Sequence, residues 1–318
     1  MAPSGSLPDV LPPGTRLADR YIVSQLIGGG GMSQVYLAQH EQLPRRVAIK
    51  ILSRALCGQP EIVARFQHEA RAASTVQHEN VVEVTDFGQT SDGRPFMVME
   101  YLDGEDLGET LIREGPFSWG RTRPFLLQIL AALQAAHDVG VIHRDIKPEN
   151  VFRISRMGSD DFVKVLDFGI AKVLAGDDSR GKHRTLSGHV LGTPAYMSPE
   201  QCLGDPVDAR SDLYAVGVLA YQMLTGHTPF ESSQPTEVMR AQVYDEPRPL
   251  REAEPDLVFG PHVEEVVRKA LEKKPARRYA SAWEFADALF EDIDIESSSL
   301  LPGLRNLFLR RRRRGNRK

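Results

Sequence analysis

The period of the hydrophobic pattern changes near Gly104, and this change limits the fold of the chain more than any other feature. Before that residue, short apolar runs are separated by polar and turn residues, which is typical of strands. After it, apolar residues recur at helical intervals. The first part is expected to form strands over residues 21–27, 35–38, 46–52, 81–87 and 96–101, with one helix over 61–76. The pattern predicts an α+β fold in two lobes with a cleft between them, a small β-rich lobe and a larger helical one.

The helical part contains three segments with clear signals. Residues 125–133 carry an apolar stripe on one face and predict a long helix that ends near Gly140. Residues 213–224 are apolar nearly all round, which in a soluble protein indicates a buried central helix. Ser281 and Glu284 have the spacing of a capping box and are expected to open a helix over residues 282–292.

The composition excludes several classes of protein. At 318 residues, with 41% hydrophobic and 26% charged side chains, the chain has globular values. No stretch reaches the roughly 20 apolar residues that a membrane helix needs, and the first 13 residues lack the features of a secretory signal. Its two cysteines, Cys57 and Cys202, lack the spacing of metal ligands and favour a reducing compartment. We therefore expect a cytoplasmic protein.

The two ends of the chain differ from its body. Residues 1–15 are rich in Pro, Gly and Ser and are expected to form a flexible leader. Residues 304–318 carry eight basic side chains and no acidic one, whereas residues 1–303 have 31 basic and 43 acidic side chains, a formal charge of −12. An acidic body argues against nucleic acid as a partner.

The tail over residues 296–318 allows two interpretations. Apolar side chains recur there at helical spacing directly before Arg310 to Arg314. This basic amphipathic pattern suits a peripheral contact of residues 304–318 with an anionic surface, such as the inner face of a membrane. Pro302 and Gly303 weaken a continuous helix, and a solvated disordered tail is the alternative.

A glycine run separates the first two expected strands. Gly28 to Gly31 are followed by Met32 and Ser33. Glycines let backbone amides approach phosphate oxygens because no Cβ stands in the way, although such a run is as often only a turn. A dinucleotide-binding fold would need a helix after the run, and here a strand follows. No Gly-Lys-Ser/Thr ends the run, which excludes a Walker loop.

Lys50 ends the next apolar strand, which reads VAIK over residues 47–50. The side chain could extend to solvent at the edge of the sheet. The alternative is that it binds the α- and β-phosphates of a nucleotide and is held by a carboxylate of the following helix. Glu69 is well placed on that helix. Glu61 competes, but it lies at the helix start, where an acidic side chain complements the helix dipole.

The most specific stretch reads HRDIKPEN over residues 143–150, followed by DFG over 167–169 and SPE over 198–200. Together with the glycine run and VAIK, these motifs have the order and spacing of eukaryotic-type serine/threonine protein kinases. From about residue 21 to 289 the sequence resembles the bacterial branch of this family. The resemblance implies a two-lobed kinase fold over residues 16–295, with the N-lobe over 16–102 and the C-lobe over 103–295. It also implies ATP as cosubstrate, Mg²⁺ or Mn²⁺ as cofactor, and protein substrates with Ser or Thr acceptors.

The resemblance assigns roles to the residues of these motifs. Asp145 would accept the proton of the acceptor hydroxyl, and Lys147 would bridge that hydroxyl and the γ-phosphate. Asn150 and Asp167 would supply the oxygen ligands that Mg²⁺ prefers. Thr193 would hydrogen-bond Asp145 and Lys147, and its motif matches the serine/threonine branch rather than the tyrosine branch. The alternative is that Asp145 and Asp167 are ordinary carboxylates in turns. It is disfavoured because Lys147 and Asn150 complete the set.

The matching positions also imply a nucleotide pocket. Its roof would be apolar and its floor would be Phe152, with Met99 as gatekeeper and residues 100–102 as the hinge that bonds the purine edge. Asp106 would hold the ribose hydroxyls. For the apolar members, core packing is the alternative interpretation, and both can be true at once. The full set is Ile27, Gly28, Gly29, Gly30, Gly31, Met32, Ser33, Val35, Ala48, Lys50, Met99, Glu100, Leu102, Asp106 and Phe152. Ser33 departs from the family pattern, which has a third loop glycine there.

The segment between Asp167 and Glu200 offers two candidate phosphorylation sites, Thr185 and Ser187. A phosphate there could pair with Arg144, so we expect activating autophosphorylation, aided by self-association of two copies. The alternative is that these hydroxyls only decorate a polar loop.

Three further residues resemble scaffold positions of the family. Glu200 and Arg278 would form a buried ion pair, and Asp212 would cap the backbone of the loop that carries Asp145. His143 is interpreted as a structural support, and residues 157–161 as a hairpin tip. A nucleotide-binding pseudokinase is the main rival function, and a small-molecule kinase is the other.

Overall fold

The computed structural model describes residues 10–156, 158–168, 194–254 and 260–290, which divide into two compact units. The β-rich unit comprises residues 10–77 and 82–103, and the helical unit comprises 78–81 and the described residues from 104 onward. Residues 78–81 join the helical unit because Asn80 belongs to its hydrogen-bond network. Its Nδ2 donates to the Val163 carbonyl at 2.7 Å and to Gln128 Oε1 at 3.1 Å, and its own carbonyl accepts from the Val165 amide.

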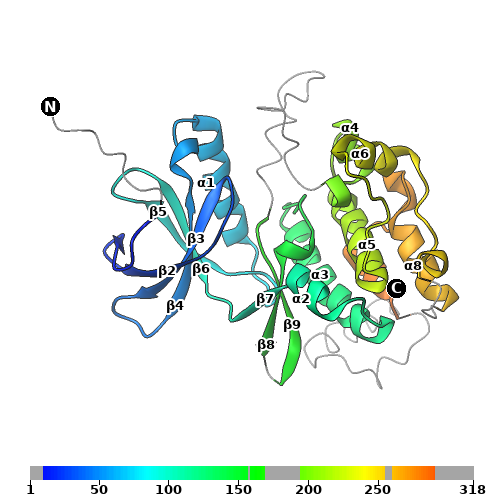
Figure 1. The fold of residues 1–318 in the computed structure, drawn as a ribbon, viewed down its shortest axis with the longest axis horizontal. Helices are drawn as coiled ribbons and strands as arrows, with labels where there is room; N and C mark the ends of the chain where they lie inside the picture. Colours follow the sequence, from blue (N-terminus) through cyan, green and yellow to red (C-terminus); the bar gives the residue numbers. More distant parts are fainter. Residues whose placement is uncertain (1–9, 157, 169–193, 255–259, 291–318) are drawn as a thin grey trace. The chain divides into compact units, whose positions relative to one another are not determined.

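The β-rich unit is an antiparallel sheet with one long helix (Figure 1). The strands follow the order β1-β2-β3-β4-β6-β5. Their bounds are β1 Arg16–Leu17, β2 Tyr21–Gly29, β3 Ser33–His40, β4 Arg46–Leu52, β5 Val84–Gln89 and β6 Pro95–Glu100, and the helix α1 covers Pro60–Thr75. The strand expected over residues 81–87 is wrong at its start. Val81 instead bridges Val165 in parallel, within the helical unit, so β5 begins only at Val84.

The two faces of this sheet bury different side chains. One face carries the hydrophobic core of the unit, which includes Tyr36, Ile49 and Val98. Because side chains of a strand alternate between faces, their neighbours Val35, Ala48, Lys50 and Met99 share the opposite face. Several residues predicted to bind a nucleotide therefore come together on one side of the sheet.

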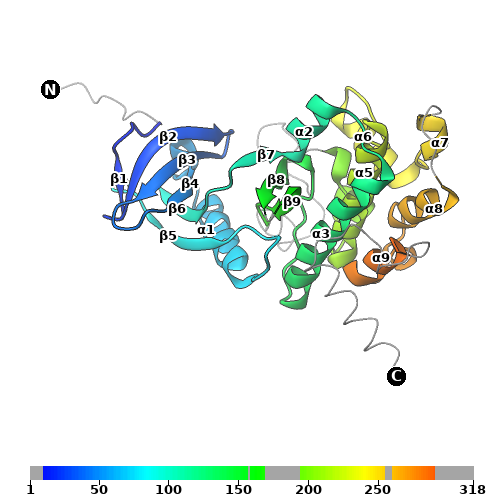
Figure 2. The same cartoon turned by 90° about the horizontal axis from the view of Figure 1, so that it is seen from below.

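The helical unit begins with a short three-stranded sheet of order β7-β8-β9. Among its helices, α3 and α5 lie side by side, with α8 and α9 beyond them (Figure 2). Helix α5 is buried along nearly its whole length, as the apolar pattern of residues 213–224 predicts. The bounds are β7 Gly104–Asp106, α2 Leu107–Glu114, α3 Trp119–Asp138, β8 Val151–Arg156, β9 Ser159–Val165, α4 Pro199–Leu203, α5 Ala209–Thr225, α6 Pro235–Tyr244, α7 Leu250–Ala253, α8 Pro261–Ala270 and α9 Ala282–Ala288.

Two predicted details of the helical unit are wrong. Helix α9 ends at Ala288 and not at residue 292, because the Leu289 amide closes the helix on carbonyls of its last turn. Ser281 caps α9 as expected by accepting from the Glu284 amide at 3.1 Å. The Glu284 carboxylate, however, accepts from the Ala280 amide at 2.8 Å and not from that of Ser281, so the capping box is incomplete.

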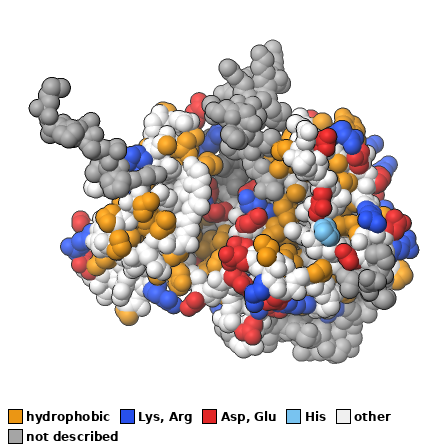
Figure 3. Space-filling view, in the orientation of Figure 1, with side chains coloured by type: hydrophobic (Ala, Val, Ile, Leu, Met, Phe, Trp, Pro, Cys, Tyr) orange, Lys and Arg blue, Asp and Glu red, His pale blue; other side chains and the backbone are white. Residues whose placement is uncertain are grey.

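The expected α+β architecture, a smaller β-rich part and a larger helical part, is confirmed. The first nine residues of the expected leader, and all of the tail over 296–318, lie outside the described residues. Within the described ranges, no helix combines the length and the apolar character that crossing a membrane requires. Figure 3 shows acidic and basic side chains interspersed on the visible face of the helical unit.

Candidate active site

In the β-rich unit, Lys50 and Glu69 form an ion pair. Lys50 Nζ lies 3.1 Å from Glu69 Oε1, and the two side chains are only 12% and 11% exposed. Glu69 belongs to the buried stripe of α1, whereas Glu61 is exposed in the first turn of that helix. The partner of Lys50 is thus Glu69, one of the two candidates that the sequence left open. Partial burial strengthens such a pair because the local dielectric constant is lower than that of water.

The glycine run forms the tip of the β2–β3 hairpin. The Gly30 amide donates to the Ser33 carbonyl at 2.9 Å and closes the loop. A Cβ at Gly29 would lie 3.3 Å from that same carbonyl, so the close approach of the two strands favours glycine there. At Gly28 and Gly31 a Cβ would meet nothing within 4 Å. Open space beside a glycine backbone fits the approach of phosphate oxygens, which is what a bound nucleotide requires.

The sheet face that carries Lys50 holds further predicted pocket residues. Val35 pairs with Lys50 across β3 and β4, and Ala48 pairs with Met99 across β4 and β6. Ala48 and Met99 are buried, whereas Ile27 and Met32, at either side of the hairpin tip, are exposed. The register of the sheet therefore brings two of the predicted roof residues, Val35 and Ala48, to the same face as the predicted gatekeeper Met99.

The predicted hinge follows β6. The Glu100 amide donates to the Glu83 carbonyl at 3.0 Å, and Glu100 Oε1 accepts from the Glu83 amide at 2.9 Å. Leu102 lies in the irregular stretch after this anchored residue. A separate apolar hollow of about 300 Å³ in the same unit is lined by residues of α1, β5 and β6 and shares none of the predicted pocket residues.

In the helical unit, Asp212 of α5 organises the loop over residues 143–150, here called the catalytic loop. Its carboxylate accepts from the His143 amide at 2.9 Å, the Arg144 amide at 2.7 Å and His137 Nε2 at 2.7 Å. Burial by itself would raise the pKa of Asp212, but these hydrogen bonds outweigh it and the pKa is lowered. The expected cap of Asp212 on this loop is thus present in the structure.

The backbone of the catalytic loop is strained at Arg144, the residue before Asp145. Its φ angle is +65°, in the left-handed region that a side chain disfavours. Such a conformation costs about 1–3 kcal/mol and persists only where surrounding bonds enforce it. The two amides that Asp212 binds are those of Arg144 itself and of the preceding residue.

His143 connects the catalytic loop to the end of β9. Its Nε2 donates to the Leu166 carbonyl at 2.7 Å, and its Nδ1 accepts from the Asp145 amide at 3.3 Å. One nitrogen donates and the other accepts, so the imidazole is neutral, and burial lowers its pKa. The ring also contacts Phe168, with centroids 4.8 Å apart. His143 therefore acts as a structural support that connects the catalytic loop to the residues on either side of Asp167.

Asp145, Lys147 and Asn150 converge within the catalytic loop. Lys147 Nζ lies 3.3 Å from Asp145 Oδ2, and Asn150 Nδ2 donates to the Asp145 carbonyl at 2.7 Å and to its Oδ2 at 3.1 Å. These bonds use the nitrogen of the Asn150 amide, which leaves its oxygen as the atom that can bind a cation. The donor set therefore fits the metal role predicted for Asn150.

Asp167 lies two residues after the end of β9, and the pairing of the strands brings this end of β9 close to Asn150. Val151 pairs with Val165, and the Leu166 amide donates to the Asn150 carbonyl at 2.8 Å. In the described ranges, no group of three or more His, Cys, Asp or Glu side chains could hold a metal ion alone. Two oxygen donors from the chain are nonetheless enough for Mg²⁺, which retains water and phosphate ligands.

Asp106 and Phe152, the predicted ribose and floor residues, are direct partners across β7 and β8. Asp106 also caps α2, because its Oδ1 accepts from the Glu109 amide at 2.9 Å. One of its two carboxylate oxygens is therefore already committed to the helix, and the other would serve a ribose hydroxyl.

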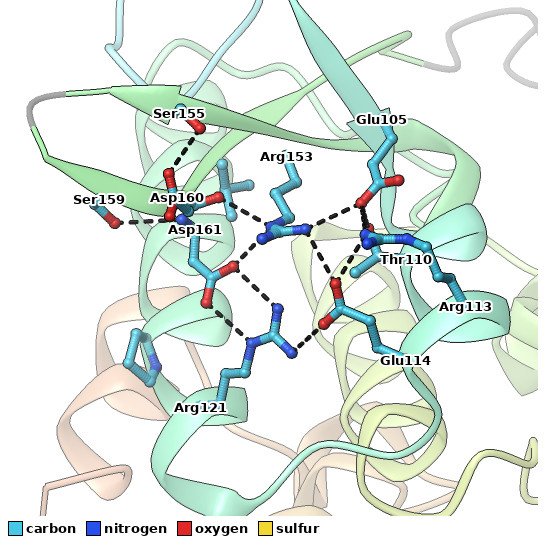
Figure 4. Close-up of polar contacts among 12 residues, drawn as sticks. Glu105, Thr110, Arg113, Glu114, Arg121, Arg153, Ser155, Ser159, Asp160 and Asp161 are labelled. Carbon is cyan, nitrogen blue, oxygen red and sulfur yellow. Dashed lines mark hydrogen bonds and ion pairs between the residues drawn. The ribbon is translucent and has the colours of Figure 1, made fainter.

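An ion network supports the sheet that carries these two residues (Figure 4). Arg153 of β8 donates to Glu105 at 3.0 Å and to Asp161 at 2.7 Å, and Arg121 of α3 donates to Asp161 at 3.0 Å and to Glu114. Burial alone would raise the pKa of Asp161, but its bonds to the two arginines lower it. Glu105 is thus occupied within the protein by Arg153, and also by Arg113 and Thr110.

Several predicted site residues cannot be placed. Thr185, Ser187 and Thr193 lie outside the described residues. One relevant residue was missed by the sequence interpretation: Gln201 of α4 donates from Nε2 to the Arg144 carbonyl at 2.9 Å. The signal for it was the spacing of Ser198 and Gln201, which fits a capping box.

Comparisons with known proteins agree with these observations. Residues 21–290 match the family model described as "Protein kinase domain". The chain is 47% identical over 272 residues to serine/threonine-protein kinase pkn3 of Myxococcus xanthus, covering 86% of this chain and 50% of that protein. It is 40% identical over 271 residues to serine/threonine-protein kinase PknB of Mycolicibacterium smegmatis, covering 84% and 42%.

A similar fold is found in a solved structure. The crystal structure of the Mycobacterium tuberculosis PknI kinase domain is similar with a TM-score of 0.67 and 30% identity, covering 88% of this chain and 98% of that one. This chain spans half or less of the length of the two curated relatives described above.

Proposed function

Because this chain belongs to the protein kinase family, as the match of residues 21–290 shows, we propose that it transfers the γ-phosphoryl group of ATP to serine and threonine hydroxyls of proteins. The resemblance to bacterial serine/threonine kinases stated from the motifs is confirmed by relatives at 40–47% identity. The convergence of Asp145, Lys147 and Asn150 carries the proposal, because a nucleotide-binding pseudokinase would not need a carboxylate base beside a lysine.

Asp145 and Lys147 act on the acceptor hydroxyl and the phosphate. Asp145 accepts the proton while the hydroxyl oxygen forms its bond to phosphorus and the bond to the bridging oxygen of ADP breaks. Lys147, held 3.3 Å from Asp145, stabilises the negative charge on the transferred group. Thr193, which lies outside the described residues, would bond both side chains, as the family resemblance implies, and so tie the acceptor segment to them. The reaction leaves ADP, a phosphorylated hydroxyl and one proton.

The remaining predicted residues bind and orient the nucleotide. Lys50, fixed by Glu69, binds the α- and β-phosphates under the glycine loop of residues 28–33. Asn150 and Asp167 would hold Mg²⁺, or Mn²⁺ in its place, and the bound ion would neutralise charge on the phosphates. Met99, Glu100 and Leu102 contact the purine together with Ile27, Val35, Ala48 and Phe152, and Asp106 binds the ribose.

The proposal also covers how the activity is regulated and where in the cell the protein acts. Autophosphorylation of Thr185, of Ser187 or of both, between two copies of the chain, raises the activity through pairing of a phosphate with Arg144. The protein acts in the cytoplasm, with residues 304–318 as a peripheral contact to anionic membrane lipids. Replacing Thr185 and Ser187 by Ala together should lower the activity, and equal activity of both forms would contradict this part.

The main test is phosphate transfer. The full chain is incubated with labelled ATP, Mg²⁺ and a generic protein substrate, with Asp145→Asn as the matched control. We expect label on serine and threonine of the substrate, dependence on the divalent cation, and loss of transfer by about 10²–10⁴-fold in the control. Nucleotide binding without transfer would favour the pseudokinase instead, and transfer to metabolites alone would favour a small-molecule kinase.

A further inference from the structure

Gln201 makes two kinds of contact through one side-chain amide. It lies in the first turn of α4, where its Oε1 accepts from the Ser198 amide at 3.0 Å and completes a capping box. Its Nε2 donates to the carbonyl of Arg144 at 2.9 Å. The partners fix the orientation of this amide, because a backbone N–H can only donate and a backbone carbonyl can only accept.

The contact to Arg144 completes the fixation of the strained residue. Asp212 binds the Arg144 amide on one side, and Gln201 binds the Arg144 carbonyl on the other. That carbonyl belongs to the peptide bond that joins Arg144 to Asp145. The Asp145 amide at the opposite side of the same peptide donates to His143 Nδ1 at 3.3 Å. The peptide plane is therefore held at both its oxygen and its nitrogen.

We propose that Gln201 is a positioning residue for Asp145: it holds the peptide before the catalytic base from α4, in addition to its role as a helix cap. The inference rests on the proposed kinase function, in which Asp145 accepts the proton. Rotation of this peptide plane would turn the Asp145 side chain away from the acceptor hydroxyl, and a displacement on the order of 1 Å costs about 100-fold in rate. Gln201 itself need not touch substrate.

A purely structural role of Gln201 makes a different prediction. A capping box forms with Ser or Thr at the N-cap and with either Glu or Gln three residues later. Glu at position 201 therefore keeps the cap and also complements the helix dipole. A carboxylate cannot donate to the Arg144 carbonyl, however. The variant Gln201→Glu therefore removes the contact to the catalytic loop and leaves the cap, whereas Gln201→Ala removes both.

The experiment compares the kinetics of these two variants in the full chain. We expect Gln201→Glu and Gln201→Ala to lower kcat by about 10- to 100-fold with little change in the KM for ATP, and Gln201→Glu, which keeps the cap, to lower the melting temperature less than Gln201→Ala. Gln222→Glu is the matched control: Gln222 Oε1 accepts from the Tyr196 hydroxyl, which a carboxylate also does, so this variant adds the same charge without removing a donor that the structure uses. Its kcat should stay within twofold of the original. A Gln201→Glu enzyme with an unchanged kcat overturns the proposal.

A second measurement separates this inference from the proposed function. Hydrogen exchange of the Asp145 amide should be faster in Gln201→Glu than in the original protein and in Gln222→Glu, whether or not the chain transfers phosphate. Equal exchange in all three proteins would overturn the positioning role. Absence of transfer by the unmutated chain would contradict the kinase function alone.

Discussion

The candidate residues of the β-rich unit and those of the helical unit are held in place in different ways. In the β-rich unit, Val35, Ala48, Lys50 and Met99 project from a regular sheet, and strand register alone puts them on one face. In the helical unit the catalytic loop has little regular structure, and side chains from α4 and α5 bind its backbone instead. The comparison teaches that chemistry and stability are separable in the first region and coupled in the second.

The largest expected effect comes from breaking the coupled region. Replacing Asp212 by Asn leaves a side chain that cannot accept all three hydrogen bonds of the buried carboxylate. We expect a loss of about 3–5 kcal/mol in the free energy of unfolding, together with loss of phosphate transfer. Urea unfolding and the transfer assay measure the two. Asp208→Asn on the exposed cap of the same helix is the control and should be nearly silent, because Asn caps as well as Asp.

The next effect separates chemistry from stability in the β-rich unit. Lys50→Met should reduce kcat by about 10²–10³-fold, the range for removal of one stabilising donor. The free energy of unfolding should fall by only about 1–2 kcal/mol, because the sheet is held by its backbone while Glu69 loses its ion pair with Lys50. Arg45→Met, which removes an exposed pair with Glu83 beside the same strand, should change neither quantity. A Lys50 variant as unstable as the Asp212 variant would contradict the comparison.

A smaller effect is expected from pH. Burial holds the pKa of His143 below its usual value, so the folded protein binds the proton less readily than the unfolded chain. The stabilisation is complete above about pH 6.5 and is lost as the pH falls from there toward the folded pKa. The melting temperature should therefore fall from pH 7 to pH 5, and this fall should be smaller in His143→Gln. His78, whose pKa burial also lowers, should account for part of the remainder, and an equal slope in the His143 variant would sink the argument.

The smallest effect tests the ion network of Figure 4. Arg153→Lys keeps the charge but loses the fork that reaches Glu105 and Asp161 together. We expect a loss of about 1 kcal/mol in the free energy of unfolding and a modest rise in the KM for ATP, because Arg153 follows Phe152 on β8. Arg113→Lys, at a more exposed position of the same network, should cost about 0.5 kcal/mol or less. Equal losses in both variants would show that the contribution of these arginines to stability does not depend on their burial.

The sequence predicted the regular parts of the molecule well. The strands and the helix of the β-rich unit follow from hydrophobic period, and the buried helix α5 follows from its apolar surface. The site residues followed from motifs, and the expected contacts between Lys50 and Glu69 and between Glu200 and Arg278 are present. A local pattern could not predict contacts between residues that are far apart in the sequence. Val81 pairs with Val165 rather than with the sheet, and Gln201 reaches a carbonyl 57 positions away.

The four residues 78–81 fold with the helical unit, although the chain on both sides of them belongs to the β-rich unit. A fragment that starts at residue 104 would lack the Asn80 amide for the Val163 carbonyl and for Gln128, and so would leave two buried acceptors without that donor. The two units are consequently not exchangeable by a single cut of the chain. A recombination event that exchanged one of them at the linker near residue 103 would transfer a helical unit without its residues 78–81.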